Sequence, residues 1–157
     1  MPDAPRPDAL VLEGIDLETQ ILIVGGGSLG SAIEGGLQTM GFLNVAVLDF
    51  DEWEKKNAIN NLWPCTPGTP KASHEQFKMD IETYVEKFGS TNRWSIVVTA
   101  TDSISSRMAA FTRLKPNIGF LDVRTGLMTG TIVRGDAQFM VNNIPKDEET
   151  ESYECGQ

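Results

Sequence analysis

The chain has 157 residues, 40% of them hydrophobic and 22% charged, a length that fits one domain burying about two-thirds of the surface its unfolded form exposes. Its formal net charge of -9 argues against non-specific nucleic-acid binding, because phosphate backbones repel an acidic surface. No uncharged apolar run is long enough to span a membrane, and Cys65 and Cys155 form no C-x-x-C pair, so we expect a cytoplasmic protein without a disulfide framework or zinc site.

The first third of the chain predicts a strand, a helix and a second strand after a mobile start. Residues 1–8 hold three prolines and two aspartates, which offer nothing to bury, and a short helix or irregular lead-in follows to residue 19. We expect a strand over 20–24 and a helix over 28–40, ended by Gly41. The apolar run at 45–48 predicts a strand covered on both faces.

The middle of the chain predicts a long loop followed by less regular elements. Residues 50–70 are rich in asparagine, proline and tryptophan, and loops of that length in a compact domain are usually functional. Residues 71–88 fit a helix better than a short strand. A strand over 94–100 and a helix over 103–114 come next.

The last third predicts further strands and a loose end. They are expected over 118–123, 126–133 and 137–141, the last two forming a hairpin or meander. An acidic tail over 145–157 leaves one domain over 9–144. Strands that alternate with helices predict an α/β fold with a Rossmann-like, doubly wound, mostly parallel sheet and a C-terminal antiparallel hairpin, whose ligand lies beyond the C-terminal strand ends.

A glycine pattern lies between the first strand and the first helix. Gly25, Gly27 and Gly30 have the spacing G-x-G-x-x-G. Gly25 would let the chain turn tightly, Gly27 would let the backbone approach a phosphate at the helix N-terminus, and Gly30 would let the helix pack closely on the sheet. Asp49, about 20 residues further on, stands where a ribose hydroxyl would be held. The pattern predicts a nucleotide site without specifying the nucleotide.

Five short motifs follow one another within residues 18–141. They are Gly25 to Gly30, Asp49-Phe50-Asp51, Asn57-Ala58-Ile59-Asn60, Gly68-Thr69-Pro70-Lys71, and Asp102-Ser103 with Arg107. In this order they resemble the adenylation domain of the ubiquitin-activating enzymes and their bacterial relatives MoeB and ThiF. Residues 120–124 and 126–133 also look like the next strand and hairpin of that family.

This resemblance implies ATP, magnesium and adenylation of the C-terminal carboxylate of a ubiquitin-like or sulfur-carrier protein, by a chain that forms a homodimer. It implies that Gly27, Ser28 and Gly30 cradle the phosphates, that Asp49 holds the ribose, and that Asp102 holds magnesium. Lys71 would meet the phosphate charge. Catalytic positions fall on Lys71, Asp102 and Asn57, and the other nucleotide-binding positions are Gly25, Asp51, Asn60 and Arg107.

The chain departs from the family pattern in three places. Asn60 stands where the family has an arginine, and Lys55 or Lys56 would replace it only without the planar fork of a guanidinium. The paired C-x-x-C zinc ligands of many relatives are absent. Family members usually continue well beyond this length, and residues 71–94 leave room for one helix, so we expect a truncated or reduced member.

Each singled-out residue also has a purely structural explanation. Lys71 would be an exposed first-turn lysine and Asp102 a helix cap, Asn57, Asn60 and Asn61 would build turns, and Arg107 would form a surface salt bridge. Trp53 and Trp63 would pack the loop, Cys65 would be incidental, and His74 would be a solvated helix residue. Two alternative functions stay open: a catalytically reduced nucleotide-binding scaffold and an NAD-binding oxidoreductase domain.

Overall fold

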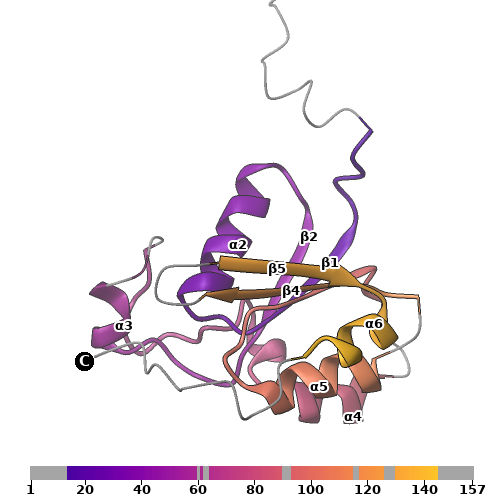
Figure 1. Ribbon diagram of the computed structural model, residues 1–157. Helices are drawn as coiled ribbons and strands as arrows, with labels where there is room; N and C mark the ends of the chain where they lie inside the picture. The colour runs from indigo at the N-terminus through magenta and orange to yellow at the C-terminus, as the bar shows by residue number, and fades with distance from the viewer. Residues whose placement is uncertain are drawn as a thin grey trace, which may run out of the picture.

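The protein has an α/β fold built on one sheet (Figure 1). The computed structural model describes residues 14–59, 61, 64–89, 93–114, 117–125 and 130–144. Its strands are β1 (Gln20–Val24), β2 (Asn44–Leu48), β3 (Ile96–Thr99), β4 (Gly119–Thr125) and β5 (Gly130–Gly135), in the order β2-β1-β3-β4-β5. The first four are parallel and β5 is antiparallel to β4, which confirms the predicted Rossmann-like sheet with a C-terminal hairpin.

Helices cover the two faces of the sheet unequally. They are α2 (Ser28–Thr39), α3 (Lys55–Ile59), a 3-10 helix η1 (Glu75–Phe77), α4 (Ile81–Phe88), α5 (Ile104–Arg113) and α6 (Ala137–Asn142). Figure 1 shows α2 on one face and α4, α5 and α6 on the other. Within the described part of the chain, none of these helices has the length and apolarity that a membrane crossing requires.

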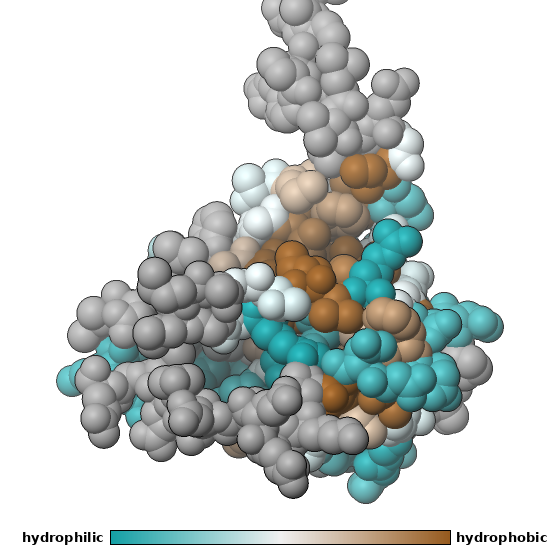
Figure 2. Space-filling model, in the orientation of Figure 1, coloured by the Kyte–Doolittle hydropathy of each residue, from teal (hydrophilic) through white to brown (hydrophobic). Residues whose placement is uncertain are grey.

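Alternation along the strands divides the core into two layers. Leu22 and Val24 of β1 pack with α4, α5 and α6, whereas Ile21 and Ile23 pack with α2. The α2 layer thins out toward the hairpin, where Ile132 of β5 is 71% exposed. Figure 2 shows apolar side chains gathered over this part of the sheet, beside hydrophilic ones. Among the described helices, α2 therefore covers this face, and it lies mainly over β2 and β1.

The end of α2 follows the prediction closely. Gly41 has φ +97°, a conformation that favours glycine, directly after the helix. Its N–H donates to Gln38 O at 3.0 Å, and the N–H of Phe42 donates to Leu37 O at 3.1 Å. These bonds satisfy carbonyl groups that the last helical turn leaves without partners.

One predicted element is wrong, and another is correct only in part. Residues 137–141 are not a strand but part of α6, because Asp136 accepts a hydrogen bond from Phe139 N at 2.9 Å and caps a helix there. Residues 71–88 are not one helix: residues 71–74 are irregular, η1 follows, and α4 begins after Asp80, whose carboxylate accepts from Thr83 N at 2.7 Å. The predicted strand over 126–133 lies partly outside the described residues, and β5 runs on to Gly135.

Candidate functional site

The glycine loop joins β1 to α2 by close backbone packing. Gly25 has φ +102°, and a Cβ added there would lie 2.8 Å from Ala100 O, so a side chain is excluded on both grounds. At Gly30 an added Cβ would lie 1.8 Å from Gly25 O. The structure thus gives Gly25 and Gly30 the turn and the helix packing that the sequence predicts. Gly26 is as restricted, because its Cβ would lie 2.6 Å from Lys71 O.

The N-terminus of α2 fits an anion. Gly27 precedes the helix, and a Cβ added to it would meet nothing within 4 Å, so the space in front of the first turn is open. No side chain of the residues that the structure describes caps this end of the helix. The first-turn N–H groups, including that of Ser28, therefore have no side-chain acceptor, and phosphate oxygens are suitable partners for them.

Asp49 lies at the tip of β2, beside the glycine loop. Its Oδ2 accepts a hydrogen bond from Gly26 N at 2.6 Å, and its Oδ1 accepts one from Asp51 N at 2.8 Å. Each carboxylate oxygen can accept more than one hydrogen bond, so a ribose hydroxyl could still donate to Asp49. The loop and the predicted ribose residue are thus linked directly, across 23 residues of sequence.

Lys71 lies against the same loop. Its backbone carbonyl faces Gly26, and its N–H donates to Asp51 O at 2.9 Å. The side chain is 14% exposed, with Nζ 3.4 Å from Asp51 Oδ2 and 5.7 Å from the centroid of the Trp53 ring. Lys71 is therefore not the exposed surface lysine of the structural alternative. Trp53 is buried, as expected for a residue that packs the loop.

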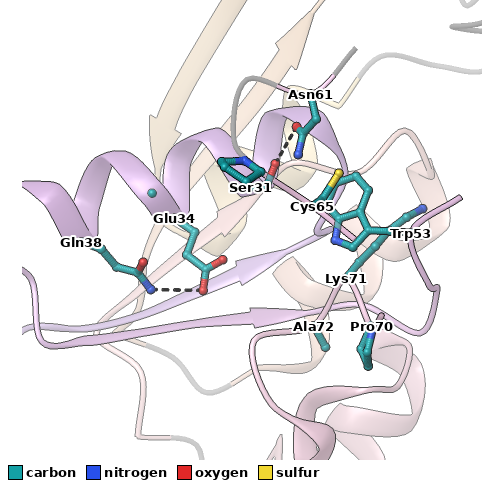
Figure 3. Close-up of a pocket in the computed structure, with 11 residues that line it drawn as sticks. Ser31, Glu34, Gln38, Trp53, Asn61, Cys65, Pro70, Lys71 and Ala72 are labelled. Carbon is teal, nitrogen blue, oxygen red and sulfur yellow. Dashed lines mark hydrogen bonds between the residues drawn. The ribbon is translucent and has the colours of Figure 1, made fainter. Parts of the chain in front are cut away.

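A polar cavity of about 290 Å³ lies between α2 and the loop that holds Lys71. Figure 3 shows Glu34 and Gln38 on the helix side and Trp53, Cys65 and Lys71 on the loop side. Burial raises the pKa of Glu34, against the opposing effect of His74. Of the predicted site residues that the structure describes, Lys71 alone lines this cavity, so the cavity adjoins the glycine loop rather than coinciding with it.

The asparagine segment divides between loop structure and helix contact. Asn57 Oδ1 accepts from Glu54 N at 3.3 Å, a local bond of the kind expected from a turn-building residue. Asn61 Oδ1 accepts from Ser31 Oγ at 3.0 Å and so ties the loop to α2. Asn60 lies outside the described residues. Lys56, a suggested substitute for the missing arginine, forms an exposed ion pair with Glu54 at 3.3 Å.

Asp102 follows β3 at the N-terminal end of α5. The cap of that helix is Ser103, whose Oγ accepts from Ser106 N at 3.2 Å, so the capping explanation of Asp102 is wrong. Asp102 is exposed. Among the described residues no group of three or more His, Cys, Asp or Glu side chains could hold a metal ion. Magnesium, however, usually takes one or two carboxylates together with substrate phosphates and water, and Asp102 fits that pattern.

A buried charge cluster, which the sequence reasoning missed, lies next to Asp102. Asp122 of β4 is fully buried, and its Oδ1 accepts from Thr99 Oγ1 at 2.5 Å. Arg124 Nε donates to Asp122 Oδ2. Arg107 Nε lies 2.9 Å from Asp122 Oδ1, although its N–H is not directed at an acceptor, so this contact is one of charge. A lone carboxylate in the apolar strand Gly-Phe-Leu-Asp-Val was the signal, because a buried charge needs a partner.

Arg107 belongs to the interior rather than to the surface. Its side chain is 10% exposed, which excludes the predicted surface salt bridge. Burial lowers the pKa of Arg107, Asp122 opposes that shift, and the charge of Arg124 adds to it. Asp102 also acts on Arg107 electrostatically, which places all four charged groups in one neighbourhood.

The predicted site residues meet at the C-terminal edge of the sheet. Val24, Leu48 and Thr99 are aligned across β1, β2 and β3, and Asp122 of β4 pairs with Thr99. Beyond this row lie, from β2 to β4, Asp49, the glycine loop, Asp102 and Arg124. In open α/β sheets, ligands bind in the crevice outside this edge.

Comparisons with known proteins support the fold. No family model and no curated protein matches this sequence. Among solved structures, the chain is similar to E. coli MccB with a TM-score of 0.51 and 15% sequence identity. The match covers 68% of this chain and 36% of the MccB chain. At that identity the likeness establishes a shared fold.

Proposed function

We propose that this protein is an ATP-dependent adenylyltransferase that activates the C-terminal carboxylate of a ubiquitin-like or sulfur-carrier protein. The hydrogen bond from Gly26 N to Asp49 carries the proposal, because it joins the phosphate loop to the ribose acceptor. Lys71 and Asp102 supply the further charges that distinguish an ATP site from a dinucleotide site in the family that the sequence resembles. The likeness to the MccB fold is consistent with this assignment.

The proposed reaction requires mainly that the protein position the substrates and stabilise negative charge on the phosphate. The carboxylate attacks the α-phosphate of ATP, a new carboxyl–phosphate bond forms, and pyrophosphate leaves. A carboxylate is already ionised at neutral pH, so no general base is needed. Charge that develops on the phosphate oxygens must be offset by fixed cations and N–H donors. Magnesium, when bound, would offset part of the same charge.

The residues of this chain divide that work among them. The first-turn N–H groups of α2, after Gly27, would donate to phosphate oxygens. Asp49 would accept from the ribose, and Asp102 would hold magnesium. Lys71 is held near the loop by Asp51 at 3.4 Å, and its ammonium would turn to a phosphate oxygen when the nucleotide binds.

Exchange of labelled pyrophosphate into ATP, dependent on a Gly-Gly-ended carrier, tests the proposal. Lys71→Ala should reduce the exchange by 10-fold or more, because charge-assisted hydrogen bonds to charged groups contribute about 1.5–3 kcal/mol. Lys87→Ala, which removes an exposed lysine at the end of α4, is the matched control. Absence of exchange with every carrier, together with an unchanged background in Lys71→Ala, would refute the proposed adenylyltransferase activity.

A catalytically reduced nucleotide-binding scaffold is the second candidate. It is favoured by Asn60 in place of the family's arginine and by the ion pair that occupies Lys56. Stabilisation of the protein by ATP without pyrophosphate exchange would support it. Titration with NADH in parallel separates both candidates from an oxidoreductase domain, which would bind NADH more tightly than ATP.

A further inference from the structure

The buried carboxylate of Asp122 has two guanidinium neighbours. Arg107 and Arg124 both contact its carboxylate, which also accepts a hydrogen bond from Thr99. The carboxylate, completely buried, can balance only one guanidinium. Asp102 also acts electrostatically on Arg107.

Of the two arginines, Arg124 is the one whose side chain reaches the surface with N–H donors that no described residue accepts. Its side chain is 21% exposed, against 10% for Arg107. Its Nε donates to Asp122, and the structure gives its two terminal amino groups no hydrogen bond or ion pair with any described residue. A guanidinium presents five N–H donors, so four remain. Asp122 thus orients Arg124 and leaves most of its donors for a ligand.

The position of Arg124 places those donors at the ligand edge. Asp122 is aligned with Thr99, the last residue of β3, and Arg124 lies two residues further along β4. Two strand spacings of about 4.8 Å separate β4 from β1, which carries the glycine loop. A nucleotide with its ribose at Asp49 would extend along the edge toward Arg124.

We propose that Arg124 is an oxyanion-binding residue of this edge, oriented by Asp122 as a positioning residue. Its ligand is a phosphate group of the nucleotide or the carboxylate of the carrier tail. Both are planar or tetrahedral oxyanions that a guanidinium can clasp with two parallel N–H bonds. The assignment to these two sources rests on the proposed function.

Direct binding measurements with Arg124→Gln, Arg124→Lys and Arg134→Gln test the proposal. Arg134 lies on the same hairpin, pairs with Leu121 and is exposed, so it is the matched control. The probes are ATP, adenosine, inorganic pyrophosphate, a synthetic peptide ending in Gly-Gly with a free carboxylate, and its C-terminal amide. Urea unfolding of each variant establishes that the fold is retained.

We expect Arg124→Gln to weaken one oxyanion probe by about 10-fold to 100-fold, with partial recovery in Arg124→Lys and none of the effect in Arg134→Gln. Adenosine and the peptide amide should bind as to the wild type. A loss confined to ATP and pyrophosphate identifies a phosphate site. A loss confined to the free-carboxylate peptide identifies a carboxylate site.

The failures of the two proposals are distinguishable. If ATP does not bind but pyrophosphate binds through Arg124, the oxyanion site is supported and the adenylyltransferase function is refuted. If ATP binds and Arg124→Gln binds ATP, pyrophosphate and the free-carboxylate peptide as tightly as the wild type, the oxyanion site is overturned and the proposed function stands. Binding of none of these three probes to the wild type overturns both.

Discussion

Replacement of Gly30 by alanine tests the packing of α2 on the glycine loop. The added Cβ would lie 1.8 Å from Gly25 O, and this oxygen belongs to the backbone, so no side-chain rotation can move it. The helix and the loop must separate by about 1.2 Å before this distance reaches 3.0 Å, below which real Cβ contacts essentially do not occur. Gly36 of the same helix is the matched control, because its added Cβ would meet nothing within 4 Å.

The two substitutions should change stability in opposite directions. Alanine gains about 0.5–1 kcal/mol over glycine within a helix, whereas overpacking costs typically 1–3 kcal/mol and occasionally more. A clash with backbone belongs at the upper end, so Gly30→Ala should lose about 2 kcal/mol or more in net terms. For a chain of this size that loss lowers Tm by about 4–8 °C, and Gly36→Ala should raise Tm by about 1–4 °C.

Thermal unfolding followed by circular dichroism measures both effects. Gly30→Ala should also weaken the proposed binding of ATP, since the glycine loop must shift. A Gly30→Ala protein with the Tm of the wild type or higher would refute the close packing of Gly30 on Gly25. A loss of stability in Gly36→Ala equal to that in Gly30→Ala would show that helical glycines matter here for another reason.

Three further substitutions test charges and caps by urea unfolding. Asp80→Ala removes the cap of α4 and should cost about 1 kcal/mol at pH 7. The hydrogen bond from Thr83 lowers the pKa of Asp80, so the stabilisation is present above the ordinary value of 3.8 and disappears as the pH falls through the lower folded pKa. A loss of stability that persists in acid contradicts this explanation. Glu34→Gln should stabilise the protein at neutral pH but not below pH 4.5. Burial raises the pKa of Glu34, so ionising its carboxyl group costs folding free energy as the pH rises. A gain in stability that does not depend on pH would disprove this explanation. Asp122→Asn removes the buried carboxylate that contacts two guanidinium groups and should cost about 3–5 kcal/mol. This is well above the loss expected in Thr99→Val, which removes one hydrogen bond, and equal losses would mean that Asp122 does not balance the arginines.

The elements that could be predicted are those whose signals lie close together in sequence. The strand, glycine loop, helix and second strand of residues 20–48 form one continuous unit, and the structure places α2 within one residue of its predicted end. α6 was misread because apolar residues at 137, 139 and 141 alternate as in a strand. Ala137, Met140, Val141 and Ile144 actually face the core, and this is a helical spacing.

The contacts of the candidate site also differ in how far they could be predicted from the sequence. Gly26 and Asp49 meet within the first strand, helix and strand unit, so the family motif was enough to bring them together. Asp122, Thr99 and Arg107 come from three elements, and their contact depends on which strands are neighbours. Sequence spacing carries no such information. A charged residue inside an apolar strand marks that a partner must exist but does not identify it.

The antiparallel direction of β5 affects how this site can change over evolution. Strand β4 ends at Thr125 and β5 begins at Gly130, both at the same edge as the glycine loop. Insertions between these two residues would alter what approaches the ligand edge without disturbing the buried rows of the sheet. Connections on a rigid scaffold accept such variation most readily. Proteins that share this framework would therefore acquire different substrates through this connection, while the glycine loop stays the same.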